Sequence, residues 1–210
     1  KSVLNKRIQN LTVLVEGVSK PHNLSAILRT CDAAGVFNAN FICAKNEVKT
    51  FNSTAQGSQK WVNLINHSTS NEAISKLKKK GVKLYGTTLN HKAKDYREFD
   101  YTSDTCFVLG AEKWGLSENL INVVDESIFI PMSGMVQSLN VSVAASILLF
   151  EAIRQREVKG LIPKNGEGLD EKVYKKTLFE WSYPELIAKY NKLGKPYPCL
   201  TEKGDINLEI

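Results

Sequence analysis

The strongest constraint on the fold of this chain is the alternation of strand-like runs with segments of helical periodicity over its first 160 residues. Runs rich in β-branched and aromatic residues predict strands at 11–18, 39–44, 61–66, 83–89, 105–109 and 126–131. Apolar residues at helical spacing predict helices at 23–34, 71–80, 117–124 and 138–157. Because such alternation is typical of strands joined by helical crossovers, we expect an α/β domain with a largely parallel sheet.

The pattern changes after residue 160. Residues 161–168 are rich in Pro, Gly and Asn and show no periodicity, which is typical of a linker. Residues 169–193 predict one or two short basic amphipathic helices broken at Pro184, and 196–198 is expected to be extended. The sequence therefore predicts a main domain at 1–160, with a short N-terminal arm, and a C-terminal extension at 161–210.

The composition favours a soluble protein with a polyanionic partner. The formal net charge is +6 and the pI is near 9.0, a balance common in RNA- and DNA-binding proteins, although many basic proteins bind no nucleic acid. No run approaches the roughly 20 apolar residues that span a bilayer, and the polar N-terminus does not resemble a signal peptide. The four cysteines include no CxxC pair, which favours a reducing compartment, so we expect a cytoplasmic protein.

The sequence lacks the signatures of several kinds of nucleotide-binding and metal-binding site. Gly110 and Gly115 have the spacing of a phosphate-binding P-loop, but Leu116 and Ser117 follow where that motif needs Lys and Ser or Thr. The GxGxxG pattern of dinucleotide-binding proteins is absent. The three histidines are widely spaced and have no second ligand type nearby, so structural or solvated histidines are the simpler interpretation and no metal is expected.

Three polar loops, each between a strand and a helix, are the remaining candidates for a functional site. The first spans 21–35, where the spacing of the core residues leaves Ser25, Arg29 and Asp32 together on a neighbouring helix face. Arg29 is therefore expected near the active edge of the sheet. The simpler role, if this loop stood alone, is an ordinary i, i+3 salt bridge with Asp32.

The second loop, 110–117, follows an apolar strand. Ligands of open α/β sheets bind at the carboxyl ends of the strands, and Gly110 lets the backbone approach a ligand closely. Glu112 is then a candidate polar contact, or else a surface carboxylate before a turn.

The third loop leads from the strand at 126–131 into a helix that is apolar on nearly all sides. Such a helix must be buried on two sides, so one face is expected to contact the sheet and the other a second subunit. Ser138 is the expected N-cap, and Asn140 behind it adds an amide beside the pocket. The alternative is a capped core helix with an incidental glycine-rich lead-in.

Together, in this order, the three loops resemble the three motifs of the SPOUT-class RNA methyltransferases, and within that class the TrmH type. The similarity runs over about 11–160, and 183–184 and 196–198 resemble the C-terminal extension of those enzymes. One departure is the N-terminus: the relatives have a longer basic helical arm, whereas only residues 1–10 precede the first predicted strand. Either the chain is trimmed or its tRNA binding is weaker or differently distributed.

This resemblance implies a SPOUT fold: a parallel sheet with helices on both faces, a C-terminal deep trefoil knot, and a homodimer. It also implies transfer of a methyl group from S-adenosylmethionine to the ribose 2′-hydroxyl of guanosine 18 in the tRNA D-loop. Two alternatives stay open, a ribosomal RNA 2′-O-methyltransferase of the same family and a non-catalytic RNA-binding module.

The resemblance also implies roles for individual residues. The residues that would bind the cofactor, largely through their backbone groups, are Thr87, Gly110, Ile130 and Leu139. The catalytic positions are Arg29, Asn23, Glu112, Ser138 and Asn140. The arginine of the first motif is proposed as the base in this family, yet a free guanidinium has a pKa above about 12, so stabilisation of the developing alkoxide is at least as reasonable.

RNA phosphates need cationic contacts outside the catalytic site. The candidates flank the predicted main domain and its last helix: Lys6, Arg7, Arg154, Arg156 and Lys164. The lysine-rich run at 76–83 is more simply explained as a solvated helix face.

Overall fold

The computed structural model describes residues 1–18, 20–42, 60–111 and 114–207. This part of the chain forms two compact units. The main unit is Ile8–Ile162, and the C-terminal unit combines Lys1–Arg7 with Pro163–Ile210. The first seven residues, assigned from the sequence to the main domain, thus belong to the unit formed by the C-terminal segment.

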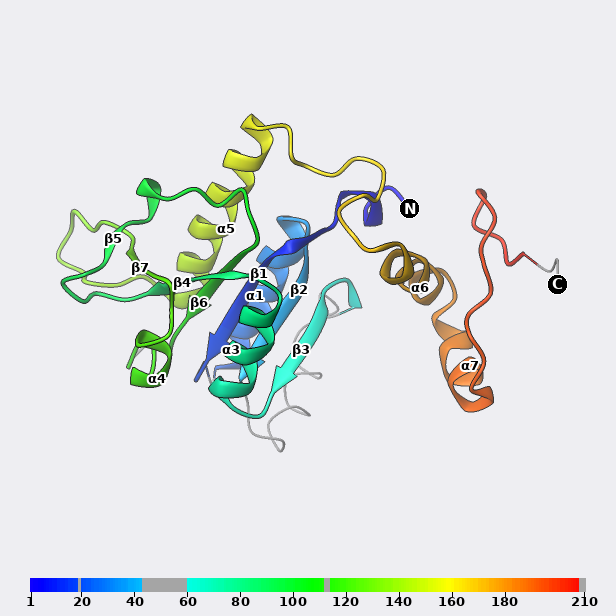
Figure 1. Ribbon diagram of the computed structural model, residues 1–210, viewed down its shortest axis with the longest axis horizontal. Coiled ribbons are helices and arrows are strands. Elements are labelled where there is room, and N and C mark those ends of the chain that lie inside the picture. Colours follow the sequence, from blue (N-terminus) through cyan, green and yellow to red (C-terminus); the bar gives the residue numbers. More distant parts are fainter. Residues whose placement is uncertain (19, 43–59, 112–113, 208–210) are drawn as a thin grey trace. The chain divides into compact units, whose positions relative to one another are not determined.

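The main unit is built on one seven-stranded sheet (Figure 1). Its strands are β1 (Ile8–Glu16), β2 (Val36–Ile42), β3 (Asn63–His67), β4 (Lys83–Thr87), β5 (Lys94–Asp95), β6 (Thr105–Leu109) and β7 (Glu126–Phe129). The order is β3-β2-β1-β6-β4-β7-β5, and each neighbouring pair is parallel. The prediction of a parallel α/β fold is confirmed, and each of the six predicted strands overlaps an observed one.

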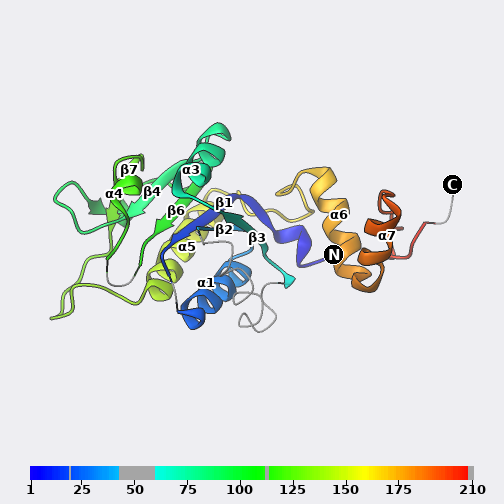
Figure 2. The same cartoon turned by 90° about the horizontal axis from the view of Figure 1, so that it is seen from below.

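Helices cover both faces of the sheet (Figure 2). On one face α1 (Pro21–Ala33) and α5 (Val141–Val158) pack over Val13 and Val15 of β1. On the other face α3 (Ser70–Lys79) and α4 (Glu118–Ile121) pack over Leu14. Because successive side chains of a strand point to opposite faces, the continuous apolar run of β1 supplies both cores.

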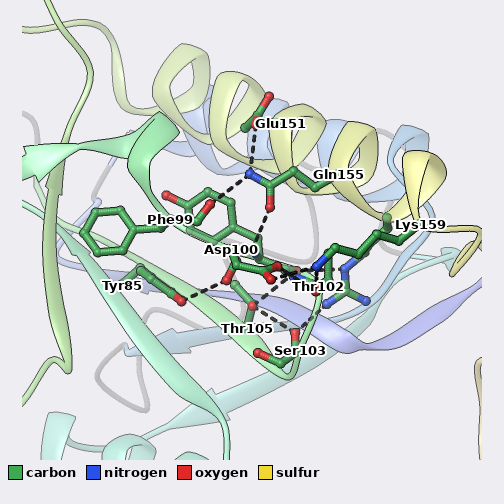
Figure 3. A network of polar contacts seen from close by, with 11 residues as sticks. Tyr85, Phe99, Asp100, Thr102, Ser103, Thr105, Glu151, Gln155 and Lys159 are labelled. Atoms are coloured by element: carbon green, nitrogen blue, oxygen red, sulfur yellow. Dashed lines mark hydrogen bonds and ion pairs between the residues drawn. The ribbon is translucent and has the colours of Figure 1, made fainter.

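A polar network fixes the C-terminal half of α5 to the segment that precedes β6 (Figure 3). Gln155 accepts a hydrogen bond from the backbone N–H of Tyr101 at 2.8 Å and donates one to the backbone oxygen of Phe99 at 2.9 Å. Lys159 contacts Asp100 at 2.8 Å, and its ammonium group lowers the pKa of that carboxyl. The far end of α5 is therefore held at the amino edge of the sheet, and its first turn lies at the carboxyl edge.

The C-terminal unit is held together by aromatic side chains. It contains η1 (Leu4–Lys6), the helices α6 (Glu171–Ser182) and α7 (Ile187–Leu193), and between them η4 (Pro184–Leu186), so the predicted break at Pro184 is confirmed. Phe179 stacks on Tyr197 with ring centroids 4.5 Å apart, which ties the extended tail to α6. The N-terminal residues join this unit through the backbone N–H of Gly166, which donates to the oxygen of Asn5. No helix in the described part of the chain has the length and apolar character needed to cross a membrane.

Candidate active site

A cavity of about 420 Å³ lies at the carboxyl edge of β4, β6 and β7. The segments that follow these three strands form its walls, together with the first turns of α5. All four positions expected to hold a cofactor are in the lining: Thr87, Gly110, Ile130 and Leu139. Segments far apart in the sequence therefore meet in one pocket, as expected where parallel strands end together.

The wall formed after β6 is a tight turn. The backbone N–H of Ala111 donates to the oxygen of Gly115 at 3.0 Å, and the N–H of Gly115 donates back to Ala111 at 2.8 Å. A Cβ atom on Gly110 would lie 2.2 Å from the carbonyl carbon of Gly115, closer than any side chain tolerates. Gly110 is thus required for the turn, which brings backbone rather than side chains to the cavity.

Two asparagines meet beside the cavity. Asn140 is the N-cap of α5, and its Oδ1 accepts hydrogen bonds from the backbone N–H of Ser142 at 2.8 Å and from the Ser142 hydroxyl at 2.6 Å. Its Nδ2 donates to Oδ1 of Asn23, a buried residue in the first turn of α1, at 3.1 Å. Because the capping contacts occupy Oδ1, the amide of Asn140 has one orientation, and it in turn orients the amide of Asn23.

The expectation that Ser138 caps α5 is wrong. The helix begins two residues later than that capping position requires, and Asn140 takes the role. Ser138 instead lies exposed in the loop that lines the cavity. Ser138 therefore belongs to the cavity lining and not to the helix cap.

Arg29 lies on α1 nearly two turns beyond Asn23 and outside the cavity lining. Its side chain is exposed. The guanidinium therefore remains accessible to an incoming polyanion. Glu112, the other charged candidate, lies outside the described residues.

Three of the five RNA-contact candidates are exposed: Lys6, Arg154 and Lys164. Arg154 forms an ion pair with Glu151 at 2.7 Å, and a hydrogen bond from Arg154 lowers the pKa of that carboxyl. This contact leaves the guanidinium 62% exposed, so Arg154 can still reach a phosphate.

The structure contradicts the other two RNA-contact predictions. Arg156 is 2% exposed, and its guanidinium donates to the backbone oxygens of Tyr101 and Ser103 and to Oδ1 of Asn10. Arg7 is 1% exposed and lies 5.5 Å from the centroid of the Trp181 ring. Both side chains make contacts within the protein and are too buried to bind RNA.

A second cavity, of about 600 Å³, lies in the C-terminal unit and was not predicted. Four lysines line it, Lys172, Lys175, Lys176 and Lys195, beside the Tyr197 ring. The first three recur at helical spacing on one face of α6, a signal that the sequence does contain. Cationic side chains beside an aromatic ring suit an RNA backbone and base.

Comparison with known proteins assigns the chain to a family. The model of the SpoU rRNA Methylase family matches residues 10–150, and that of SpoU, rRNA methylase, C-terminal matches 154–208. The chain belongs to the SpoU methylase family. A relative from Thermus thermophilus is 52% identical over 181 residues, covering 86% of this chain and 92% of its own length. A relative from Escherichia coli is 41% identical over 207 residues, covering 99% and 90%. Both are named tRNA (guanosine(18)-2′-O)-methyltransferase.

Solved structures of SpoU methylases share this fold. The crystal structure of the A. aeolicus TrmH/SpoU tRNA modifying enzyme is 39% identical with a TM-score of 0.77, covering 89% of this chain and 94% of that one. The SpoU methyltransferase AviRb from Streptomyces viridochromogenes, solved with the cofactor AdoMet, is 28% identical with a TM-score of 0.64, covering 72% and 62%. The expected SPOUT fold is thereby confirmed. The trefoil knot stays a prediction, consistent with a strand order in which β6 lies between β1 and β4.

The cavity of this SpoU methylase fits S-adenosylmethionine, the cofactor of the family. Leu109, Ile128 and Leu148 give it apolar walls suited to an adenine ring. The turn at Gly110 supplies backbone at close range, which explains why no glycine-rich phosphate motif is needed. Within the described residues no group of three or more His, Cys, Asp or Glu side chains is arranged to hold a metal ion.

Proposed function

We propose that this chain transfers the methyl group of S-adenosylmethionine to the ribose 2′-hydroxyl of guanosine 18 in the tRNA D-loop. The observation that carries the proposal is the cavity containing all four expected cofactor positions next to the oriented Asn23–Asn140 pair. The names of relatives at 39–52% identity support the substrate. Since tRNA is the substrate, the proposed place of action is the cytoplasm.

The proposed cofactor residues act mainly by lining a cavity that holds the cofactor. When bound, S-adenosylmethionine supplies a methyl group on a positively charged sulfur, ready for attack in line. The backbone of Gly110, Ile130 and Leu139 and the wall at Thr87 would hold it, since these groups face the cavity from three separate loops. Ser138 lies in the same lining and can contact the ribose or the cofactor.

A ribose 2′-hydroxyl is a weak acid, so its attack requires stabilisation of the charge that develops on oxygen. We assign this role to Arg29, which is exposed and accessible to the RNA. A guanidinium keeps its proton near neutral pH and so is a poor general base; we therefore favour electrostatic stabilisation, with an RNA phosphate assisting proton removal. The amides of Asn23 and Asn140 would fix the ribose, and Glu112 stays a candidate contact.

The test is methylation of a tRNA pool with labelled S-adenosylmethionine, followed by mapping of the modified nucleotide. Arg29→Ala should lower turnover by about 10²–10³-fold, as for loss of one group that stabilises a developing oxyanion in other enzymes, while leaving affinity for S-adenosylhomocysteine within about twofold. Arg29→Lys keeps the charge and should recover part of the activity if the role is electrostatic. Near-normal turnover of Arg29→Ala would rule out both roles.

The RNA is proposed to contact Lys6, Lys164 and Arg154, together with the lysine-lined cavity of the C-terminal unit. Replacing two exposed cations should weaken binding of every tRNA and reduce the slope of log affinity against log salt by about 1.5–2. The matched control is Lys79→Ala, an exposed lysine in the run at 76–83. An unchanged slope would remove the replaced residues from the interface.

A homodimer is proposed from the outer face of α5. Val143 and Phe150 are seven residues apart, on one face of the first half of α5, and are 45% and 50% exposed. An apolar stripe of this kind on the helix that begins at the active site supports a subunit contact.

The alternative substrate is ribosomal RNA. It is favoured by one observation: a relative from Acinetobacter baylyi named 23S rRNA (guanosine-2′-O-)-methyltransferase RlmB is 35% identical, although it matches 73% of this chain and 63% of its own length. Mapping the product on a mixture of tRNA and ribosomal RNA separates the two substrates. Absence of S-adenosylhomocysteine binding would instead indicate a non-catalytic RNA-binding module.

A further inference from the structure

Glu16, the last residue of β1, lies at the same edge of the sheet as the cofactor cavity. Its carboxylate accepts three hydrogen bonds. The hydroxyl of Ser70 donates at 2.6 Å, the backbone N–H of Ser117 at 2.9 Å, and the hydroxyl of Ser117 at 3.0 Å. One half-buried side chain therefore joins the start of α3 to the segment that leads into α4.

The position of Glu16 follows from the pairing of β1 with β6. Val15 is in register with Leu109, so the residues just beyond each of them emerge side by side. Gly17 has φ 67° and passes so close to Ala111 that a Cβ on Gly17 would lie 3.4 Å from the Ala111 Cβ. The end of β1 thus lies beside the outgoing arm of the turn, Gly110 and Ala111, and holds the return arm through the contacts of Glu16 with Ser117.

The turn held in this way is a wall of the cavity. Gly110 and Ala111 on the outgoing arm and Gly115 and Leu116 on the return arm all line it. The return arm continues directly into Ser117, whose N–H and hydroxyl both donate to Glu16. A displacement of Ser117 would therefore move the adjoining cavity wall.

The negative charge of Glu16 suits this position. A carboxylate is an acceptor only, so it can take hydrogen bonds from all three donors at once. The N–H groups at the starts of helices also favour an anion nearby. A glutamine of the same shape would keep one acceptor oxygen but would turn an N–H₂ group toward donors.

We propose that Glu16 is a positioning residue for the cofactor pocket: by holding Ser117 it fixes the return arm of the turn, residues 114–117, in the position that accepts S-adenosylmethionine. The proposal rests on the proposed function, because it requires that this cavity binds the cofactor. The competing role is plain support of α3 through Ser70, which would affect stability without affecting the cavity.

Calorimetric titration with S-adenosylhomocysteine distinguishes these roles. Glu16→Ala should weaken binding about tenfold, and Glu16→Gln about threefold, as expected when charge-assisted hydrogen bonds to the turn are lost. Ser70→Ala removes only the contact between Glu16 and α3. Its affinity for S-adenosylhomocysteine should lie within about twofold of that of the unchanged chain. Glu72→Gln is the matched carboxylate control, because Glu72 accepts from the N–H of Ser68 near the same helix start.

Two further measurements separate positioning from stability. Hydrogen–deuterium exchange should become faster at 110–117 in Glu16→Ala but stay unchanged in β7, which lines the same cavity. In methylation assays, Glu16→Ala should raise KM for S-adenosylmethionine about tenfold, with kcat at saturating cofactor within about twofold.

The outcomes are distinct. If the unchanged chain does not bind S-adenosylhomocysteine, the proposed function is wrong. If it binds and both Glu16 variants bind equally well with unchanged exchange at 110–117, the role of Glu16 is wrong. Should Glu16→Ala fail to fold, Glu16→Gln carries the test by the same two measurements, and equal loss in Ser70→Ala would indicate support of α3 alone.

Discussion

Replacing Arg156 by Ala should destabilise the main unit far more than replacing Arg154, two residues away on the same helix. Arg156 donates four hydrogen bonds, to the backbone oxygens of Tyr101, Ser103 and Asn10 and to Oδ1 of Asn10. Each hydrogen bond from a charged group contributes about 1.5–3 kcal/mol, but the losses are not additive because water can reach some vacated acceptors. We expect a loss of about 3–5 kcal/mol in the free energy of unfolding, because about two of the vacated oxygen acceptors would stay buried without a donor, at about 1–3 kcal/mol each. The exposed ion pair of Arg154 should contribute about 0–1 kcal/mol.

Urea unfolding of the main unit, followed by circular dichroism, measures this difference. With a slope of about 2 kcal/mol per M, the midpoint should fall by about 1.5–2.5 M in Arg156→Ala and by no more than about 0.5 M in Arg154→Ala. Arg156→Lys keeps the charge but loses the several N–H donors of the guanidinium, so its urea midpoint should lie between those of the two alanine variants. Equal midpoints for the two alanine variants would refute the structural role of Arg156 and restore it as a candidate for RNA contact.

Three further predictions concern the cavity, the pH dependence and the subunit contact. Gly110→Ala should weaken S-adenosylhomocysteine binding at least about tenfold because its Cβ would meet the Gly115 backbone, whereas Gly134→Ala, with nothing within 4 Å of its Cβ, should bind normally in the same titration. Burial lowers the pKa of His67, so the unfolded chain binds a proton more readily and stability should fall as pH drops below about 6.5. In thermal melts between pH 5 and 7.5, the melting temperature of His67→Gln should decrease less at low pH than that of the unchanged chain. An unaltered pH profile would show that other groups cause the loss of stability. Phe150→Glu should convert a dimer to a monomer in light scattering; a surviving dimer would place the contact elsewhere.

The central strands β1, β2, β4 and β6 were predictable because most of their residues are buried, which sets their apolar composition. β6 has the expected bounds, Thr105–Leu109, since every residue in it is buried. β5 was missed because it consists of Lys94–Asp95, two polar residues at the sheet edge that show no periodicity. A strand that short depends on its neighbour β7 and leaves no pattern of its own.

Parts of the site were less accessible to sequence reasoning. Ser138 and Asn140 are both good N-cap residues, and the choice between them depends on Asn23, which lies on another helix. The burial of Arg156 did leave a signal, because it follows Leu149 and Ala152 at i+7 and i+4 on the buried face of α5. Its acceptors lie 53, 55 and 146 residues earlier in the chain, however, so the sequence does not show what satisfies the charge.

The contacts of Glu16 show a stronger limit. Its partners Ser70 and Ser117 are 54 and 101 residues away in the chain. The residue types at these positions are common. The parallel pairing of β1 with β6 brings Ser117 to Glu16, and the pairing of β1 with β2 and of β2 with β3 brings Ser70.

That central pairing also bears on how the chain is made. β6 begins at Thr105, about 90 residues after β1 ends, so at about 5–20 residues per second a ribosome needs roughly 5–20 seconds between the two. Throughout that interval one edge of β1 has unpaired N–H and C=O groups beside apolar side chains, and such an edge recruits strands from other chains. The nascent protein therefore depends on shielding until β6 has emerged, and losing a chaperone should reduce its yield through aggregation without altering the finished enzyme.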